Sequence, residues 1–142
     1  MERNRAWVQA DIARAVRATL QREGCQRATL SVAVVDDTTI AELHERYLGI
    51  DEPTDVLSFD LADAPGDGSV DGQIVVSSTT ATREAKERGI PVRHELLRYV
   101  IHGTLHLLGY SDATPTEAEI MHSLEDELIA VTTNGGPKTE KG

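Results

Sequence analysis

The sequence predicts an α+β fold, in which a small mixed β-sheet is packed by helices. Three short stretches are apolar and rich in β-branched residues, whereas the remaining apolar residues recur at the spacing of amphipathic helices. The order is helix, strand, helix, two strands and then helices, which is not a regular alternation of strand and helix. We expect one domain over residues 1–131 and a disordered tail over residues 132–142.

The composition limits the class of protein. The 142 residues are 39% hydrophobic and 27% charged, which is typical of a single soluble domain. The single cysteine, Cys25, excludes an internal disulfide and fits a reducing cytoplasm. No stretch approaches the roughly 20 apolar residues of a membrane span, and the N-terminus lacks the pattern of a signal peptide. We therefore expect a cytoplasmic protein without a membrane partner, and we favour a monomer.

The charge is acidic overall but unevenly distributed. The formal net charge of −10 argues against loose binding to bulk nucleic acid, so no DNA partner is expected. Residues 28–78 hold eleven acids and one base, whereas residues 79–98 hold five bases and three acids. The basic segment predicts either a positive face on the folded chain or an ordinary solvated helix surface.

The first third of the chain is expected to hold a helix, a strand and a second helix. Residues 8–22 have apolar residues at helical spacing, with arginines on the other face. Residues 28–35 alternate and are β-branched, which predicts a strand. Thr38 and Thr39 are the expected caps of a short helix that ends at Gly49.

Two further strands are expected in the middle of the chain. Residues 56–61 and 73–77 are apolar runs, and residues 62–72 between them are rich in glycine and aspartate. This arrangement predicts a hairpin with a long loop.

The second half of the chain has the pattern of helices. Residues 79–88 form the first, which ends at Gly89. A central helix begins near Pro91, is apolar around most of its circumference, and has Gly109 as its expected C-cap. A last helix opens at Pro115.

The end of the central helix carries a candidate metal site in the stretch HGTLHLLGYSD. His102 and His106 are four residues apart and share one face of a helix, so both imidazoles can bind one ion. Gly109 allows a sharp turn, which brings Asp112 within reach as a third ligand. Three protein ligands leave a fourth position for water, which is the arrangement of catalytic zinc sites.

Other interpretations of this stretch stay open. Two histidines four residues apart are a weak signal alone, and the alternative is a pair that is hydrogen-bonded near a helix end. His122 on the last helix is another possible third ligand. Gly103 stands where zincin proteases carry a glutamate as general base, which disfavours peptide hydrolysis.

Three stretches resemble the YbeY family of bacterial endoribonucleases, which are rRNA maturation factors. HGTLHLLGYSD is similar to the family motif HGxLHLxGYDH, EPTDVLSFD to KPTDVLSFP, and DGQIVVS to GDIxIS. The resemblance implies a zincin-like metal site at the end of the central helix. It also implies a cytoplasmic, zinc-dependent endoribonuclease that cuts single-stranded RNA. Its partners would be rRNA and the small ribosomal subunit, in rRNA maturation and ribosome quality control.

The resemblance implies three histidine ligands, and this chain departs from that set. His102 and His106 match the first two, whereas the ungapped alignment puts Asp112 at the third. A carboxylate is an accepted zinc ligand, so the expected metal-binding and catalytic residues are His102, His106 and Asp112. A different alignment pairs Asp112 with the aspartate that precedes the family's third histidine, and leaves no third ligand in this loop.

A second departure concerns RNA binding. The family stretch YRGKD reads YLGID here, so Leu48 and Ile50 replace an arginine and a lysine. This departure and Asp112 favour a rival function, a non-catalytic ribosome-assembly factor with a structural metal. Metal-dependent hydrolysis of another substrate is a third possibility.

Four residues are the expected contacts to substrate. Asp55 and Ser58 lie in the stretch that resembles PTDVLSF, where they would line the cleft beside the metal, although Asp55 is equally suited to capping the loop. Arg83 and Arg98 belong to the basic helices that would guide the RNA backbone.

Overall fold

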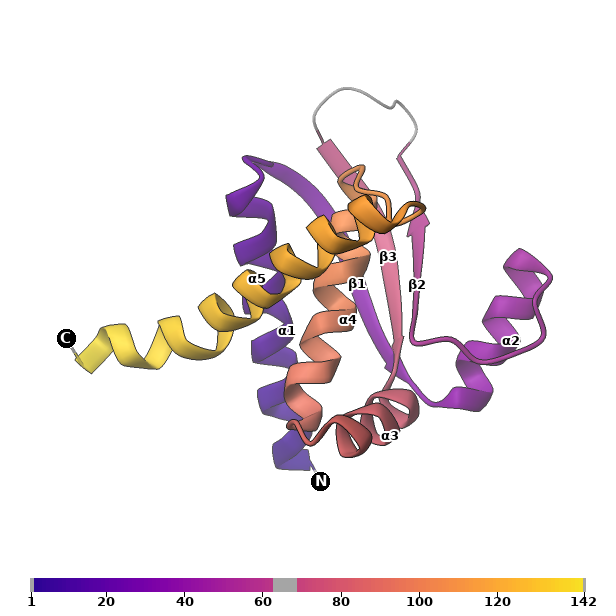
Figure 1. Ribbon diagram of the computed structural model, residues 1–142, viewed down its shortest axis with the longest axis horizontal. Coiled ribbons are helices and arrows are strands. Elements are labelled where there is room, and N and C mark those ends of the chain that lie inside the picture. Colours follow the sequence, from indigo (N-terminus) through magenta and orange to yellow (C-terminus); the bar gives the residue numbers. More distant parts are fainter. Residues whose placement is uncertain (1, 63–68, 142) are drawn as a thin grey trace.

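The computed structural model describes the backbone of residues 2–62 and 69–141 and the side chains of residues 9–62 and 69–133. Figure 1 labels its elements, which follow the predicted order. None of the helices in this described part of the chain is long and apolar enough to cross a membrane. The elements are α1 (Glu2–Arg22), β1 (Arg27–Val35), α2 (Asp37–Leu48), β2 (Val56–Asp60), β3 (Ser69–Ser77), α3 (Ser78–Arg88), α4 (Val92–Leu107) and α5 (Pro115–Lys141).

The sheet has three strands in the order β1-β3-β2. β3 runs parallel to β1 and antiparallel to β2, and Ile74 at its centre is paired with Val32 on one side and Ser58 on the other. The predicted α+β class, the small mixed sheet and the hairpin are therefore confirmed.

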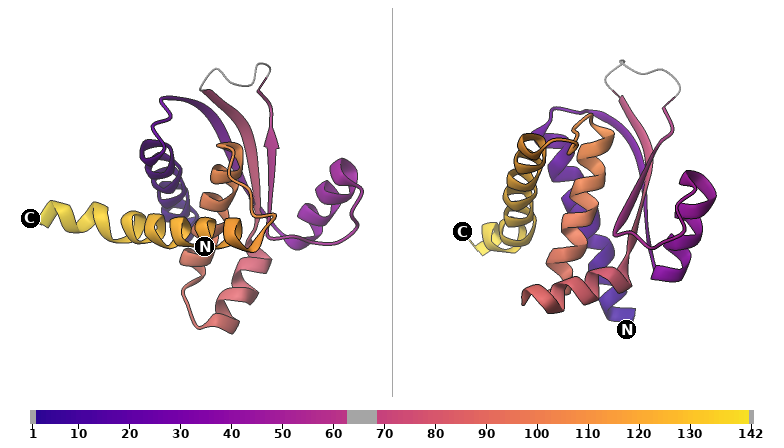
Figure 2. Two further views of the ribbon diagram at one scale, coloured as in Figure 1. Left: turned by 45° about the horizontal axis from the view of Figure 1, so that its top comes forward. Right: turned by 45° about the vertical axis from the view of Figure 1, so that its right-hand side comes forward.

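The sheet separates two apolar clusters, which lie on its opposite faces. Ile74 and Val76 pack with the side chains of α1, α4 and α5, whereas Val75, between them in sequence, packs with Ile40 of α2. Alternate residues of a strand point to opposite faces, which explains this division. Figure 2 shows α4 and α5 on one side of the sheet and α2 on the other.

Two elements are longer than the sequence predicts. α1 begins at Glu2 rather than at residue 8, and β3 begins at Ser69 rather than at residue 73. The longer strand follows from its pairing with β1, whose register extends to Arg27 opposite Ser69. Residues 63–68 of the expected loop lie outside the described residues.

The caps of the short helices are partly as predicted. Asp36, and not Thr38 or Thr39, caps α2, because its side chain accepts a 2.8 Å hydrogen bond from the backbone N–H of Thr39. Gly49 and Gly89 end α2 and α3 in the left-handed conformation, as the sequence indicates.

The last helix continues into the expected tail. α5 extends to Lys141, and Thr132 is only 1% exposed. The Thr132 hydroxyl donates a 2.7 Å hydrogen bond to the carbonyl of Leu128. The expected domain boundary at residue 131 and the disorder of the tail beyond it stay predictions.

Candidate metal centre

Helix α4 carries both histidines and is fixed in the core on its other faces by buried Leu97, Ile101 and Leu105. Gly103 lets the helix approach the sheet closely, because a Cβ atom there would lie 2.8 Å from Ser58 Oγ and 2.9 Å from Ile74 Cγ2. The Ser58 hydroxyl instead donates a 3.2 Å hydrogen bond to the Gly103 carbonyl. The close approach fixes the height of the histidine face above the sheet.

The chain reverses directly after α4. Leu108 caps the helix, and Gly109 has a φ of 108°, which is unfavourable for residues with a side chain. The next residue, Tyr110, is anchored because its hydroxyl donates a 2.9 Å hydrogen bond to Glu23, which directly follows α1. This hydrogen bond raises the pKa of Tyr110. The turn directs Asp112 back toward the histidines.

The three predicted ligands converge. His102 Nε2 lies 3.0 Å from His106 Nε2. Asp112 Oδ2 lies 3.4 Å from His102 Nε2, and its Oδ1 lies 3.7 Å from His106 Nε2. Among the described residues, these three side chains form the group whose ligand atoms lie close enough together to hold a metal ion, and His122 is not part of that group.

Hydrogen bonds fix which nitrogen of each ring faces its neighbour. His102 Nδ1 donates to Glu125 Oε2 at 2.6 Å, and His106 Nδ1 donates to the Tyr110 carbonyl at 3.0 Å. A carboxylate and a carbonyl only accept, so both Nδ1 atoms carry their protons. The two Nε2 lone pairs then face each other, which is unfavourable unless a proton or a metal ion lies between them.

The donor set fits a divalent metal ion such as zinc. Two donors, each about 2.0–2.1 Å from a tetrahedral zinc ion, lie roughly 3.3 Å apart, which is close to the separations measured here. Imidazole nitrogen and carboxylate oxygen are both accepted zinc ligands. The side chain of Asp112 is 44% exposed, so the site opens toward solvent on that side.

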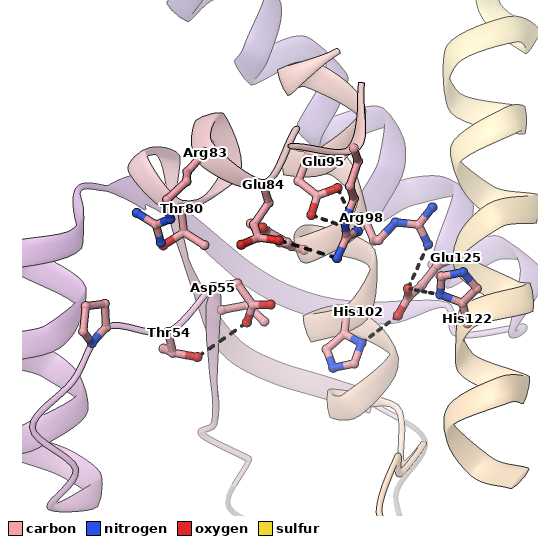
Figure 3. Close-up of a pocket in the computed structure, with 14 residues that line it drawn as sticks. Thr54, Asp55, Thr80, Arg83, Glu84, Glu95, Arg98, His102, His122 and Glu125 are labelled. Atoms are coloured by element: carbon pink, nitrogen blue, oxygen red, sulfur yellow. Dashed lines mark hydrogen bonds and ion pairs between the residues drawn. The ribbon is translucent and has the colours of Figure 1, made fainter. Parts of the chain in front are cut away.

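The environment of His102 is strongly acidic. Burial lowers the pKa of His102, but the hydrogen bond to Glu125 and the negative charges of Glu125 and Asp112 outweigh it, so the pKa lies above its ordinary value. Arg98 in turn donates to Glu125 Oε1 at 3.1 Å. Figure 3 shows Glu125 between Arg98 and His102.

A cavity of about 630 Å³ extends from His102 toward α3. Asp55, Arg83 and Arg98 line it, whereas Ser58 is not among the lining residues and is hydrogen-bonded to α4. Figure 3 shows these side chains around the cavity, with Arg83 at some distance from His102. The structure thus brings three of the four expected substrate contacts to one cavity, and their roles stay predictions.

Glu125 is the residue of the site that the sequence analysis missed. It is 4% exposed, although it is a glutamate on an outer helix. A signal is present in the sequence, because buried Met121, Leu124 and Leu128 form an apolar stripe at helical spacing and Glu125 falls within it. A charge on such a stripe requires a partner, and here the partners are Arg98 and His102.

The fold and the site together define an α+β protein with a candidate three-ligand metal site at the end of its central helix, an arrangement typical of metal-dependent hydrolases. The family described as Endoribonuclease YbeY matches residues 2–133. The chain belongs to the YbeY family.

Individual relatives agree with this assignment. A protein of Persephonella marina named Endoribonuclease YbeY is 39% identical over 118 residues, which are 81% of this chain and 77% of the relative. One of Chelativorans sp. with the same name is 41% identical over 130 residues, or 89% and 80% of the two chains. The solution structure of TM1509 from Thermotoga maritima matches with a TM-score of 0.65 and 26% identity, over 89% of this chain and 82% of that one.

Proposed function

We propose that this chain is a cytoplasmic, zinc-dependent endoribonuclease. It cuts single-stranded RNA in the maturation of small-subunit rRNA and in ribosome quality control. One observation carries the proposal: in a chain of the YbeY family, His102, His106 and Asp112 direct three metal-ligand atoms to one point.

The residues of the site have separate tasks. His102, His106 and Asp112 would hold the ion, and Glu125 and the Tyr110 carbonyl orient the two imidazoles. A bound divalent ion would supply Lewis acidity at a phosphoryl oxygen. The reaction consumes one water molecule and breaks one P–O ester bond of the RNA chain.

The cavity beside His102 suits the RNA backbone. Arg83 and Arg88 of α3 contribute cationic side chains to its lining. Their guanidinium groups are about half exposed and are paired with Asp37 and with Glu84 and Glu95. The Arg83–Asp37 pair is exposed on the arginine side and therefore weak, so a phosphate can replace the carboxylate as the partner of Arg83. Arg88 is held more firmly, because its partner Glu95 is only 1% exposed. Arg83 is therefore the better alternative to the cations that Leu48 and Ile50 replace.

A cleavage assay tests the proposal. The purified full chain is incubated with an end-labelled single-stranded RNA and with the same RNA in a duplex, with zinc and with a chelator. We expect cleavage of the single strand alone, abolished by the chelator and by Asp112→Ala. Asp51→Asn, an exposed change on the loop after α2, is the control and should cleave normally.

Two outcomes would contradict the proposal. Cleavage that survives both the chelator and Asp112→Ala would exclude a role for the metal site. Tight zinc binding without RNA cleavage would favour the ribosome-assembly factor, which the exposed apolar side chains of Leu48 and Ile50 suit as a protein-binding surface.

A further inference from the structure

Glu125 is the point at which helix α5 meets the metal centre. One carboxylate oxygen accepts a 2.6 Å hydrogen bond from His102, and the other accepts a 3.1 Å hydrogen bond from Arg98. Arg98 is bound a second time, at 2.7 Å, by Asp126. Four side chains from α4 and α5 therefore form one chain of charge-assisted hydrogen bonds that ends on an expected metal ligand.

We propose that Glu125 is a positioning residue, which sets the tautomer and the orientation of His102 for metal binding, and that Arg98 holds Glu125 in place. A buried carboxylate that accepts from Nδ1 keeps the proton on that nitrogen and leaves Nε2 free for the metal. Glu125 is 4% exposed, so little water competes with His102 and Arg98 for its carboxylate oxygens. This inference rests on the proposed metal site.

The two histidines are oriented by different means. His106 donates to the backbone carbonyl of Tyr110, which belongs to the turn that directly follows its own helix. His102 depends on a side chain 23 positions away in sequence, on a separate helix. The docking of α5 is therefore required for a correctly oriented His102, but not for His106.

The contacts of Arg98 with Glu125 and Asp126 indicate that this arginine supports the site rather than binding RNA. Its side chain is only 20% exposed and donates to two carboxylates at once. Burial lowers its pKa, but the hydrogen bonds to Asp126 and Glu125 outweigh burial and keep it charged. An arginine held in this way is less available to phosphate than Arg83, which is more exposed.

Nitrogen-15 NMR of the histidine side chains tests the orientation without metal or RNA. In the metal-free wild-type chain, at a pH high enough to keep the ring neutral, the His102 signals should correspond to a ring that carries its proton on Nδ1. Glu125→Met keeps the apolar packing of the stripe but has no acceptor, so His102 should shift toward a mixture of tautomers while His106 does not. Glu125→Gln keeps a carbonyl acceptor and should keep the tautomer. An unchanged His102 in Glu125→Met would overturn the proposal.

Zinc affinity, measured by competition with a chromophoric chelator, tests the consequence. Glu125→Met should bind zinc about 10- to 100-fold more weakly than wild type, and Glu125→Gln should lose less. Glu127→Gln is the matched control, because Glu127 lies on the same helix, is exposed and pairs with Arg22 of α1. Equal affinity in the wild type and Glu125→Met would contradict the role of Glu125.

Arg98→Met separates the two roles of that residue. If Arg98 holds Glu125, the variant binds zinc more weakly and its His102 signals move in the direction seen for Glu125→Met. An unchanged zinc affinity with weaker RNA binding would instead make Arg98 a contact to substrate and would overturn its assignment here. Failure of the wild-type chain to bind zinc would refute the proposed function, whereas the tautomer of His102 would still report on Glu125.

Discussion

The Nε2 atoms of His102 and His106 face each other at a distance of 3.0 Å, while both Nδ1 atoms donate to fixed acceptors. The arrangement is built for a cation, because two opposed lone pairs repel each other. Two imidazoles one helical turn apart would otherwise turn outward to water. Glu125 on α5 and the Tyr110 carbonyl in the turn that follows α4 are the acceptors that prevent this.

Replacing Asp112 by histidine should change the metal preference of the site and keep the site itself. A carboxylate is a hard ligand that suits manganese and magnesium, whereas imidazole favours zinc. We therefore expect Asp112→His to bind zinc with one ion per chain and to select it over manganese more strongly than the wild type. Metal analysis after dialysis against an equimolar mixture of the two ions measures this. If the wild type selects zinc over manganese more strongly than Asp112→His does, the expectation is wrong.

The close approach of α4 to the sheet predicts that Gly103→Ala is destabilising. The new Cβ would meet the short side chain of Ser58 and the β-branched side chain of Ile74, which have little freedom to move. Such overpacking costs about 1–3 kcal/mol in the free energy of unfolding, which urea denaturation measures.

The double variant Gly103→Ala with Ser58→Ala provides the control for this clash. Ser58→Ala removes the nearest atom, so the double variant should regain part of the loss. If Gly103→Ala alone is as stable as the wild type, the helix does not lie where the structure has it.

The carboxylate of Asp37 predicts a pH dependence of stability. Hydrogen bonds from the hydroxyls of Ser77 and Thr80 lower the pKa of Asp37, burial opposes them, and Arg83 lowers it further. A carboxylate whose pKa is lowered by folding stabilises the protein above its unfolded value of about 3.9, and this contribution is lost as the pH falls through the folded value.

Asp37→Asn should therefore be less stable than the wild type at pH 7, and the difference should shrink below about pH 4. Urea denaturation at several pH values between 7 and 3 measures it. Asp51→Asn, on an exposed loop, is the comparison and should show a smaller difference at pH 7. If the difference in the free energy of unfolding between the wild type and Asp37→Asn grows as the pH falls, the pKa of Asp37 is not lowered by folding.

Removal of Arg83 should weaken RNA binding and reduce its salt dependence. Each phosphate contact to a single strand contributes about 0.7 to the slope of log K against log salt concentration. Arg83→Ala should lower that slope by about this amount if the guanidinium meets one phosphate. Arg46→Ala is the control, because Arg46 lies on α2 and is not among the residues that line the cavity. If the salt dependence of RNA binding is the same for Arg83→Ala and Arg46→Ala, Arg83 does not contact a phosphate of the bound RNA.

Much of the fold is predictable because it depends on local sequence. Gly49 and Gly89 end their helices as expected, since the left-handed conformation at a helix end selects glycine. The parallel pairing of β1 with β3 was not predicted, because it joins strands that are more than thirty residues apart and depends on packing from both faces. The early start of β3 at Ser69 follows from that pairing.

The candidate metal ligands could be found from the sequence for the same reason, because His102, His106 and Asp112 lie within eleven residues and helical geometry relates the first two. The contacts of Glu125 and Arg98 depend on how α5 docks on α4, which residue spacing alone does not determine. The hydrogen bond between Arg98 and Glu125 can therefore be identified only from the folded structure.

Zinc content is the most direct test of the metal centre. The untagged chain is stripped with a chelator, titrated with zinc and compared with Asp112→Ala by mass spectrometry of the bound metal. The account predicts about one zinc ion per wild-type chain and weakened or absent binding in the variant. A wild-type chain that takes up no zinc would contradict it, because the cation between His102 and His106 would then be a proton.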